Sequence, residues 1–173
     1  MISKERLAFE YTRIHESTTT MSGRTTMKNK DLIKKVIDIE QPISVLDFGC
    51  GKGWQYTRQN VHKEWGIEMP HLYDPYVKGY QKLPSVGQHY YDLVLCVDVM
   101  EHILPEEVNE TLYQLFFLGR AVYFHIDTKP AIKEFTDGTN FHVSLHNKEW
   151  WEKKLYTAAN KMRRPTRYYA DFE

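Results

Sequence analysis

The stretch Val45-Leu46-Asp47-Phe48-Gly49-Cys50-Gly51-Lys52-Gly53 decides the fold, because it joins an apolar strand to a glycine-rich turn. The apolar run from residue 43 to residue 48 predicts a buried strand, and residues 53–62 predict a short helix after the turn. A parallel strand that ends in such a turn forms a nucleotide-type binding site. Glycines let the backbone approach a ligand closely and adopt positive φ angles. The stretch therefore predicts an α/β protein that binds a ligand at this turn.

The acid before the first glycine narrows the chemistry of that ligand. In dinucleotide sites the start of the helix meets a pyrophosphate, which the carboxylate of Asp47 would repel. A carboxylate here suits a ligand with a cationic amino-acid end, such as S-adenosylmethionine. A dinucleotide-dependent reductase is therefore the less favoured interpretation.

Two further acidic segments support the interpretation by their positions. Asp74 ends a short apolar strand, residues 71–74, and follows Gly53 by 21 residues, close to the spacing of about 20 at which a ribose-binding acid is expected. Asp98 ends the clearest strand, residues 91–98, and Glu101-His102 follows it. Because ligands bind at the carboxyl ends of parallel strands, these side chains are expected near the same site.

The remaining elements alternate between strand and helix. Residues 31–40 have one apolar helix face and stop before Pro42, and a second helix is predicted to open at Pro105. The other predicted elements are a strand at 121–127, a long connection at 128–146, a helix capped by Asn147 and a last strand at 166–172. The pattern predicts one domain over residues 1–173, with an α/β, Rossmann-like three-layer sandwich and a mostly parallel sheet. Residues 1–30 are polar and are predicted to form an N-terminal arm, mobile or ordered by a ligand, that would cap the cofactor site.

Composition limits the partners. The 173 residues include 23 basic and 23 acidic side chains, so no overall charge favours nucleic acid, although a basic tail around residues 161–167 leaves RNA open. No apolar run is long enough to span a membrane, the N-terminus is too polar for a signal peptide, and two cysteines suggest no disulfide framework. We therefore expect a cytoplasmic protein that does not bind membranes and whose oligomeric state the sequence leaves open.

Two motifs resemble those of class I S-adenosylmethionine-dependent methyltransferases. Residues 45–53 resemble their first motif, and Tyr91-Asp92-Leu93-Val94-Leu95-Cys96-Val97-Asp98-Val99-Met100-Glu101-His102 resembles their fourth-strand motif. Nearly the whole chain further resembles a compact group of such domains in phages and bacteria. That likeness rests on Tyr11 with His15, on the run from Phe48 to Tyr56, on Tyr73-Asp74-Pro75 and on the segment 137–151.

The resemblance implies a cofactor site. Asp47 and the glycines would hold the methionine end, and Asp74 would accept the ribose hydroxyls. The residues expected at the cofactor are Tyr11, His15, Asp47, Phe48, Gly49, Cys50, Gly51, Gly53, Trp54, Gln55, Tyr56, Asp74, Asp98, Val99 and His102. One departure concerns the third strand: only 18 residues separate Asp74 from Asp92, so the region 77–88 is expected to be abbreviated. The adenine-binding acid that commonly follows that strand has no counterpart, and the final antiparallel hairpin is expected to be incomplete.

Catalytic and substrate residues are expected after the strand at 121–127. Methyl transfer from a sulfonium depends mainly on alignment, and a base is needed only where the acceptor must lose a proton. The candidates for a base are His142, then His102, with His125 as a further candidate. Substrate contacts are expected from Asp127, Asp137, Asn140, His142 and Trp150. His142 and His146 have i, i+4 spacing, but no third ligand stands out, so no metal site is expected.

The sequence thus predicts a methyltransferase whose acceptor is a small molecule or a glycan. The alternative is a module that binds S-adenosylmethionine without transferring the methyl group, as a regulatory or partner-dependent domain; the abbreviated third-strand region motivates it.

Overall fold

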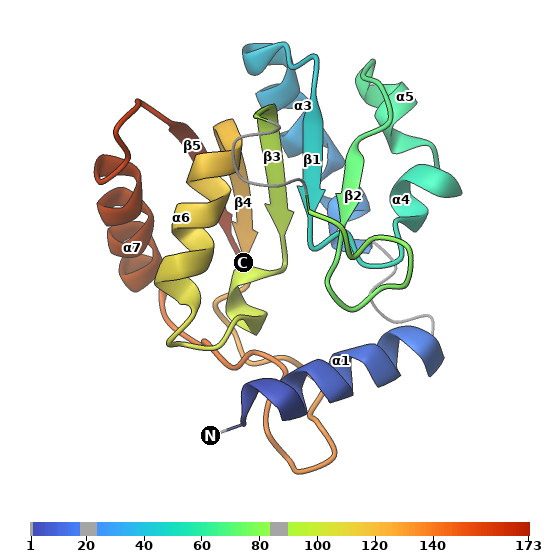
Figure 1. Cartoon of the computed structure of the whole chain (residues 1–173). Coiled ribbons are helices and arrows are strands. Elements are labelled where there is room, and N and C mark those ends of the chain that lie inside the picture. Colours follow the sequence, from blue (N-terminus) through green and yellow to red (C-terminus); the bar gives the residue numbers. More distant parts are fainter. Residues whose placement is uncertain (1, 18–23, 84–89) are drawn as a thin grey trace.

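Five parallel strands form the central sheet of the structure, a computed structural model that describes residues 2–17, 24–83 and 90–173 (Figure 1). The strands are β1 (Val45–Phe48), β2 (His71–Tyr73), β3 (Tyr91–Val97), β4 (Gly119–Ile126) and β5 (Arg167–Phe172). Their order in the sheet is β2-β1-β3-β4-β5, and each neighbouring pair is parallel. The predicted Rossmann-like α/β fold is confirmed, and each predicted strand lies within two residues of its expected bounds.

Helices cover both faces of the sheet, which makes three layers (Figure 1). One face packs against α3 (Lys30–Glu40), α4 (Trp54–Thr57) and α5 (Val61–Trp65), and the other against α6 (Val108–Leu118) and α7 (Lys148–Asn160). Burial on both faces explains why β3 is apolar along nearly its whole length. None of the helices in the described parts of the chain has the length and apolar character of a membrane span.

Local sequence signals fix several helix ends. Asn147 caps α7 by accepting a hydrogen bond from the backbone N–H of Trp150, as predicted. The single helix predicted over residues 53–62 is wrong: the chain forms the two short helices α4 and α5, separated at Asn60, whose φ is 56°. The predicted start of the next helix was Pro105, but α6 begins three residues later, at Val108.

The connection between β2 and β3 is short. Residues 74–83 contain no strand, and they turn back so that the N–H of Asp74 donates to the carbonyl of Tyr80. The rest of the region expected to be abbreviated, residues 84–88, lies outside the described residues. At the other edge, β5 runs parallel to β4, so the described strands include no antiparallel hairpin.

The N-terminal arm is largely helical, which its polar composition did not predict. It contains α1 (Lys4–Ser17) and α2 (Arg24–Lys28), and residues 18–23 between them lie outside the described residues. Leu7 and Tyr11 lie four residues apart on one face of α1 and are buried against Leu104, Phe135 and Phe141. This third cluster is separate from the two that cover the sheet. Helix α1 lies across the carboxyl ends of the strands, beside the connection 127–147 (Figure 1).

The strand order reverses between β1 and β3. The chain moves from β1 to β2 on one side and from β3 to β4 and β5 on the other. Such a switch point opens a crevice at the carboxyl ends of the two central strands, and ligands of open α/β sheets bind there. The glycine turn follows β1 and Asp98 follows β3, so the fold brings both to this crevice.

Candidate functional site

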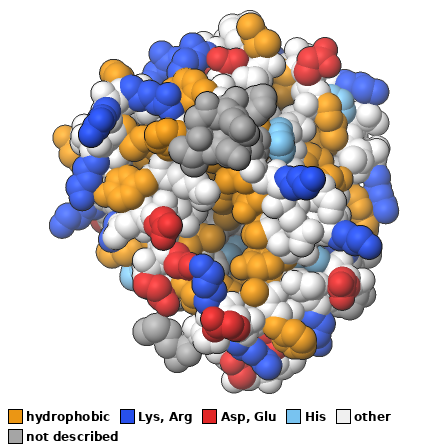
Figure 2. All heavy atoms as spheres, viewed as in Figure 1, with side chains coloured by type: hydrophobic (Ala, Val, Ile, Leu, Met, Phe, Trp, Pro, Cys, Tyr) orange, Lys and Arg blue, Asp and Glu red, His pale blue; other side chains and the backbone are white. Residues whose placement is uncertain are grey.

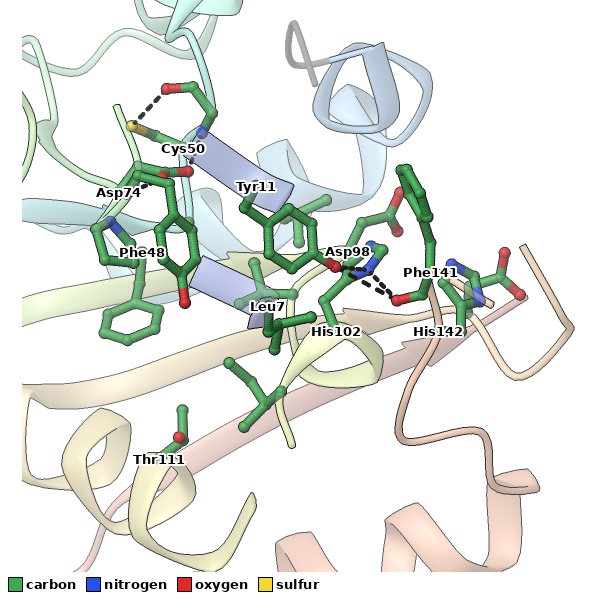
Figure 3. A pocket seen from close by; sticks show the side chains of 18 of the residues that line it. Leu7, Tyr11, Phe48, Cys50, Asp74, Asp98, His102, Thr111, Phe141 and His142 are labelled. Carbon is green, nitrogen blue, oxygen red and sulfur yellow. Dashed lines mark hydrogen bonds between the residues drawn. The ribbon is translucent and has the colours of Figure 1, made fainter. Parts of the chain in front are cut away.

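A cavity of about 1120 Å³ lies at the switch point, between the carboxyl ends of the strands and α1 (Figure 3). Its walls come from the glycine turn, the ends of β2 and β3, the inner face of α1, the start of α2, one side of α6 and the connection after β4. Hydrophobic side chains gather at the centre of the face in Figure 2, with charged side chains around them. The cavity therefore combines an apolar interior with the polar groups at the strand ends.

The glycine turn forms one wall through its backbone. Gly49, Gly51 and Gly53 have φ angles of 80°, 56° and 63°, which side chains rarely adopt. A Cβ atom on Gly49 would lie 2.3 Å from Cγ2 of Val99, so the turn packs directly against the segment after β3. The N–H groups of Gly49 and Cys50 donate to the carbonyl of Tyr73 at 2.8 and 3.0 Å, which fixes the turn to the end of β2.

Asp47 lies beneath the turn and does not line the cavity. Its side chain is buried, and its Oδ2 accepts a hydrogen bond from Gln55 at 3.1 Å. The Gln55 amide also donates to the carbonyl of Cys50. Burial raises the pKa of Asp47 from its ordinary value of 3.8 to about 6, and the neighbouring charge of Asp74 adds to the rise. In this structure Asp47 therefore supports the turn from below.

The raised pKa of Asp47 predicts a pH-dependent stability. Since the folded state holds the proton more tightly than the unfolded state, the protonated Asp47 contributes to the free energy of unfolding. This contribution is largest below pH 4 and is lost as the pH rises through 6. We expect the free energy of unfolding to fall between pH 4 and pH 7 by about 2 kcal/mol more in the wild type than in Asp47→Asn. Urea unfolding at several pH values measures this difference. Asp31→Asn, at an exposed helix position, is the control; identical slopes in wild type and Asp47→Asn would contradict the prediction.

Asp74 lines the cavity at the end of β2. Its Oδ2 accepts a hydrogen bond from the N–H of Gly51 at 3.0 Å, and its Oδ1 accepts one from the N–H of Tyr76 at 2.9 Å. Nε2 of His15 on α1 lies 3.9 Å from Oδ1. Burial raises the pKa of Asp74, although the charge of His15 and both hydrogen bonds oppose it. The carboxylate thus ties the glycine turn to the end of β2, with His15 of α1 close beside it.

The end of β3 contributes Asp98, which lines the cavity and has a φ of 54°. Its Oδ1 lies 2.8 Å from Nδ1 of His125 on β4, which is paired with the preceding Val97. Burial alone would raise the pKa of Asp98, but the hydrogen bond from His125 lowers it. His125 is buried behind Asp98 and does not line the cavity, so the structure places it as a partner of this carboxylate.

Two histidines face each other in the cavity wall. His102 follows β3 in the 3-10 turn η1 (Met100–His102), and His142 comes from the connection after β4. Their ring centroids are 4.9 Å apart. Nδ1 of His102 lies 2.9 Å from the carbonyl oxygen of Phe141 and 2.8 Å from the hydroxyl of Tyr11 on α1 (Figure 3). Burial and the neighbouring His142 lower the pKa of His102 to about 4, so its ring is neutral at pH 7.

The predicted residues divide into two groups. Those that line the cavity are Tyr11, His15, Phe48, Gly49, Cys50, Gly51, Asp74, Asp98, Val99, His102, Asp127 and His142. Those outside its lining are Asp47, Gly53, Trp54, Gln55, Tyr56, His125, Asp137, Asn140 and Trp150.

The second group has structural partners instead. Asn140 holds its own loop, because its side chain exchanges hydrogen bonds with Ala131 and accepts from the N–H of His142. Asp137 is exposed and accepts from the N–H of Thr139, and Trp150 stacks on His146 with centroids 3.6 Å apart. The structure therefore does not bring these predicted substrate residues to the cavity.

Several lining residues had no sequence prediction. On α1 these are Lys4 and Leu7, and on the far wall they include Ile103, Thr111 and Phe117. The spacing of Leu7, Tyr11 and Ile14 is a helical signal that identifies the inner face of α1. No comparable signal marks the far wall, because its residues belong to the ordinary amphipathic pattern of α6 and to the turn before it.

Comparison with known families agrees with this geometry. The family model for a methyltransferase domain matches residues 22–164, which is most of the chain. No curated protein and no solved structure gave a match. The matched range contains the glycine turn, all the strands up to β4 and the connection that carries His142. The chain therefore belongs to the methyltransferase domain family and is an S-adenosylmethionine-dependent methyltransferase.

Proposed function

We propose that this protein transfers the methyl group of S-adenosylmethionine to a small-molecule acceptor that binds in the same cavity, between α1 and the ends of β3 and β4. The single observation that carries the proposal is the cavity itself, which joins the glycine turn to a deep, mostly apolar space covered by α1. Its volume of about 1120 Å³ is slightly above the range of about 300–1,000 Å³ for a small-molecule site, which leaves space for an acceptor beside the cofactor.

The described residues fit the cofactor. The buried carboxylate of Asp74 stands at the end of β2, where the ribose would bind. The backbone of Gly49 and Gly51, without side chains, faces the cavity and would approach the methionine end. On α1, Nδ1 of His15 is buried with no hydrogen-bond partner among the described residues, so a polar group of the ligand would satisfy it.

The sheet order gives the direction of transfer. With the ribose at β2 and the methionine end at the turn after β1, the acceptor lies toward β3 and β4, where His102, Asp127 and His142 line the cavity. Apolar side chains such as Ile103, Leu104 and Phe117 line the same side, which favours an acceptor with an apolar portion over a highly polar glycan. The balanced charge of the chain gives no support for a nucleic-acid acceptor.

Two measurements test the proposal. Isothermal titration with S-adenosylhomocysteine should give a dissociation constant below about 1 mM, and NADH should not compete. Incubation with S-adenosylmethionine labelled in its methyl group and a cell extract should give a labelled small molecule. If S-adenosylhomocysteine does not bind, the cofactor assignment is refuted. If the label appears only in macromolecules, the proposed acceptor class is refuted. Binding without any labelled product would support a binding module, which the family match does not favour.

Helix α1 should contribute directly to ligand affinity. Leu7 is 4% exposed and packs in the separate cluster that holds α1 over the cavity, whereas Phe9 on the same helix is 59% exposed. Removing one buried leucine from this contact costs about 1.5–3 kcal/mol. We expect Leu7→Asp to weaken S-adenosylhomocysteine binding roughly tenfold while the sheet domain stays folded, and Phe9→Asp to leave binding unchanged. Titration of both variants measures this, and equal affinities would show that α1 does not cover the ligand.

A further inference from the structure

His102 and His142 each have Nδ1 beside a backbone carbonyl oxygen. The carbonyl oxygen of Phe141 can only accept, and it lies 2.9 Å from Nδ1 of His102. The hydroxyl of Tyr11 donates to the same carbonyl, so its 2.8 Å contact with Nδ1 is one in which the hydroxyl accepts, and both contacts place the proton on Nδ1. The 2.6 Å contact of Nδ1 of His142 with the carbonyl of Lys129 places the proton there in the same way. With the proton on Nδ1, Nε2 of each ring is the nitrogen left to accept a hydrogen bond or to bind a cation. Metal-binding histidines are oriented by this same arrangement, a second nitrogen donating to a backbone carbonyl.

Glu101 adds a buried carboxylate to the pair. Its side chain is fully buried, and its Oε1 accepts a hydrogen bond from the N–H of Asp127 at 3.1 Å. Its Oε2 has no hydrogen-bond partner among the described residues. One ligand atom each from Glu101, His102 and His142 lies within 4.8 Å of the other two. A cation between these three groups would give the unpartnered, buried oxygen of Glu101 a partner.

We propose that Glu101, His102 and His142 bind a divalent transition-metal ion such as Zn²⁺, with its remaining coordination positions toward the cavity. Two imidazoles and one carboxylate are a common ligand set for Zn²⁺ and Fe²⁺, whereas Mg²⁺ and Ca²⁺ prefer oxygen ligands throughout. Bonds of about 2.0–2.2 Å require the ligand atoms to move together by about 1 Å, which side-chain rotation supplies. The sequence interpretation found no third ligand because Glu101 and His142 are 41 residues apart.

The surrounding hydrogen bonds keep the ligands in place. The N–H of Ser144 donates to the carbonyl of Glu101 at 2.9 Å, and its hydroxyl donates to the carbonyl of Ile103 at 2.6 Å. The loop that carries His142 is thereby fixed to the turn that carries the other two ligands. Since His102 and His142 line the cavity and Glu101 lies behind them, the open positions of the ion face the ligand space.

The site suggests the chemical class of the methyl acceptor, a step that rests on the proposed function. A metal ion in this place would bind an oxygen atom of the acceptor, such as a hydroxyl or a carboxylate, and hold it beside the cofactor. His102 and His142 would then act as ligands and not as bases. This role differs from the one that the sequence suggested for them.

Titration of chelator-treated protein with Co²⁺ tests the metal site without cofactor or acceptor. We expect one Co²⁺ ion per chain with visible absorption bands, and displacement by Zn²⁺. Glu101→Gln, His102→Gln and His142→Gln should each weaken binding at least about tenfold. His146→Gln is the matched control. His146 is in the same connection as His142, but it stacks on Trp150 of α7 and lies outside the cluster. Acetohydroxamate, an oxygen-donor chelator, should change the spectrum of the bound Co²⁺ through the open positions.

Several results would overturn the proposal. These are no binding of Co²⁺ or Zn²⁺, unchanged binding in Glu101→Gln, or loss of binding in His146→Gln. An unchanged spectrum with acetohydroxamate would refute the open positions. If a histidine variant fails to fold, Glu101→Gln still tests the site. Its amide can donate a hydrogen bond to a neighbouring imidazole, so the folded state does not depend on a bound cation in this variant. Titration of the same samples with S-adenosylhomocysteine tests the proposed function separately, since the metal titration does not depend on it.

Discussion

Gly49→Ala should abolish most cofactor binding, with at least a hundredfold loss of S-adenosylhomocysteine affinity. The new methyl group would lie 2.3 Å from Cγ2 and 3.2 Å from Cγ1 of Val99, closer than non-bonded carbon atoms approach. Relief requires the glycine turn to move by about 1 Å, and a hundredfold loss of affinity corresponds to about 2.7 kcal/mol, within the usual cost of overpacking. We also expect the free energy of unfolding to fall by about 2–5 kcal/mol, from the left-handed φ and from overpacking together. Isothermal titration and urea unfolding measure the two effects.

Two companion variants separate the causes. Gly66→Ala carries a similar strain, with a φ of 72°, but no atom lies within 4 Å of the added Cβ. It should lose about 1–2 kcal/mol of stability and no cofactor affinity. The double variant Gly49→Ala/Val99→Ala removes both clashing methyl groups and should recover much of the lost affinity. If the double variant binds as poorly as Gly49→Ala alone, the contact with Val99 is not the cause.

The glycine turn and the sheet were predictable because their signals are local. The run from Val45 to Gly53 contains the strand, the turn and the positive φ positions. Strand β3 is recognisable from its continuous apolar run, which the structure buries. Helix α1 was missed because its stabilising partners are remote: Leu104 and Phe141 lie more than 90 residues after Leu7. In the first 17 residues alone, the few apolar side chains do not outweigh the polar ones.

The same distinction explains the candidate site. Asp74 and Asp98 were identified from strand ends and spacing, and both line the cavity. Trp54, Gln55 and Tyr56 were expected there, but the left-handed Gly53 starts α4 in a direction that leads away from the cavity. Tyr56 packs in the cluster on the α3 side, Gln55 bonds to Asp47, and Trp54 contacts Arg58. The orientation of His102 and His142 depends on backbone carbonyls at Phe141 and Lys129, which no spacing of residue types reveals.

Asp74→Asn should weaken cofactor binding by tenfold to a hundredfold, the second large effect. Each carboxylate oxygen accepts from a different backbone N–H, that of Gly51 and that of Tyr76. An asparagine has one acceptor oxygen, so its NH₂ group must face one of these N–H donors in a buried place. The lost charge-assisted hydrogen bond costs about 1.5–3 kcal/mol. If the whole cost falls on the position of the glycine turn, it lowers cofactor affinity by about tenfold to a hundredfold. Titration with S-adenosylhomocysteine measures the loss.

Asp92→Asn is the matched control, at the amino end of the central strand β3 and away from the cavity. Asp92 also accepts from backbone N–H groups, those of Ile43 and Ser44, but both bonds go to the single oxygen Oδ2. The oxygen of an asparagine can replace Oδ2 there, so Asp92→Asn should keep both bonds and bind the cofactor normally. Equal affinities in the two variants would show that a neutral side chain at position 74 holds the turn as well as the carboxylate does. The ribose contact would then have to come from another polar group of the cavity, and His15, whose Nδ1 has no hydrogen-bond partner among the described residues, would be the first to examine.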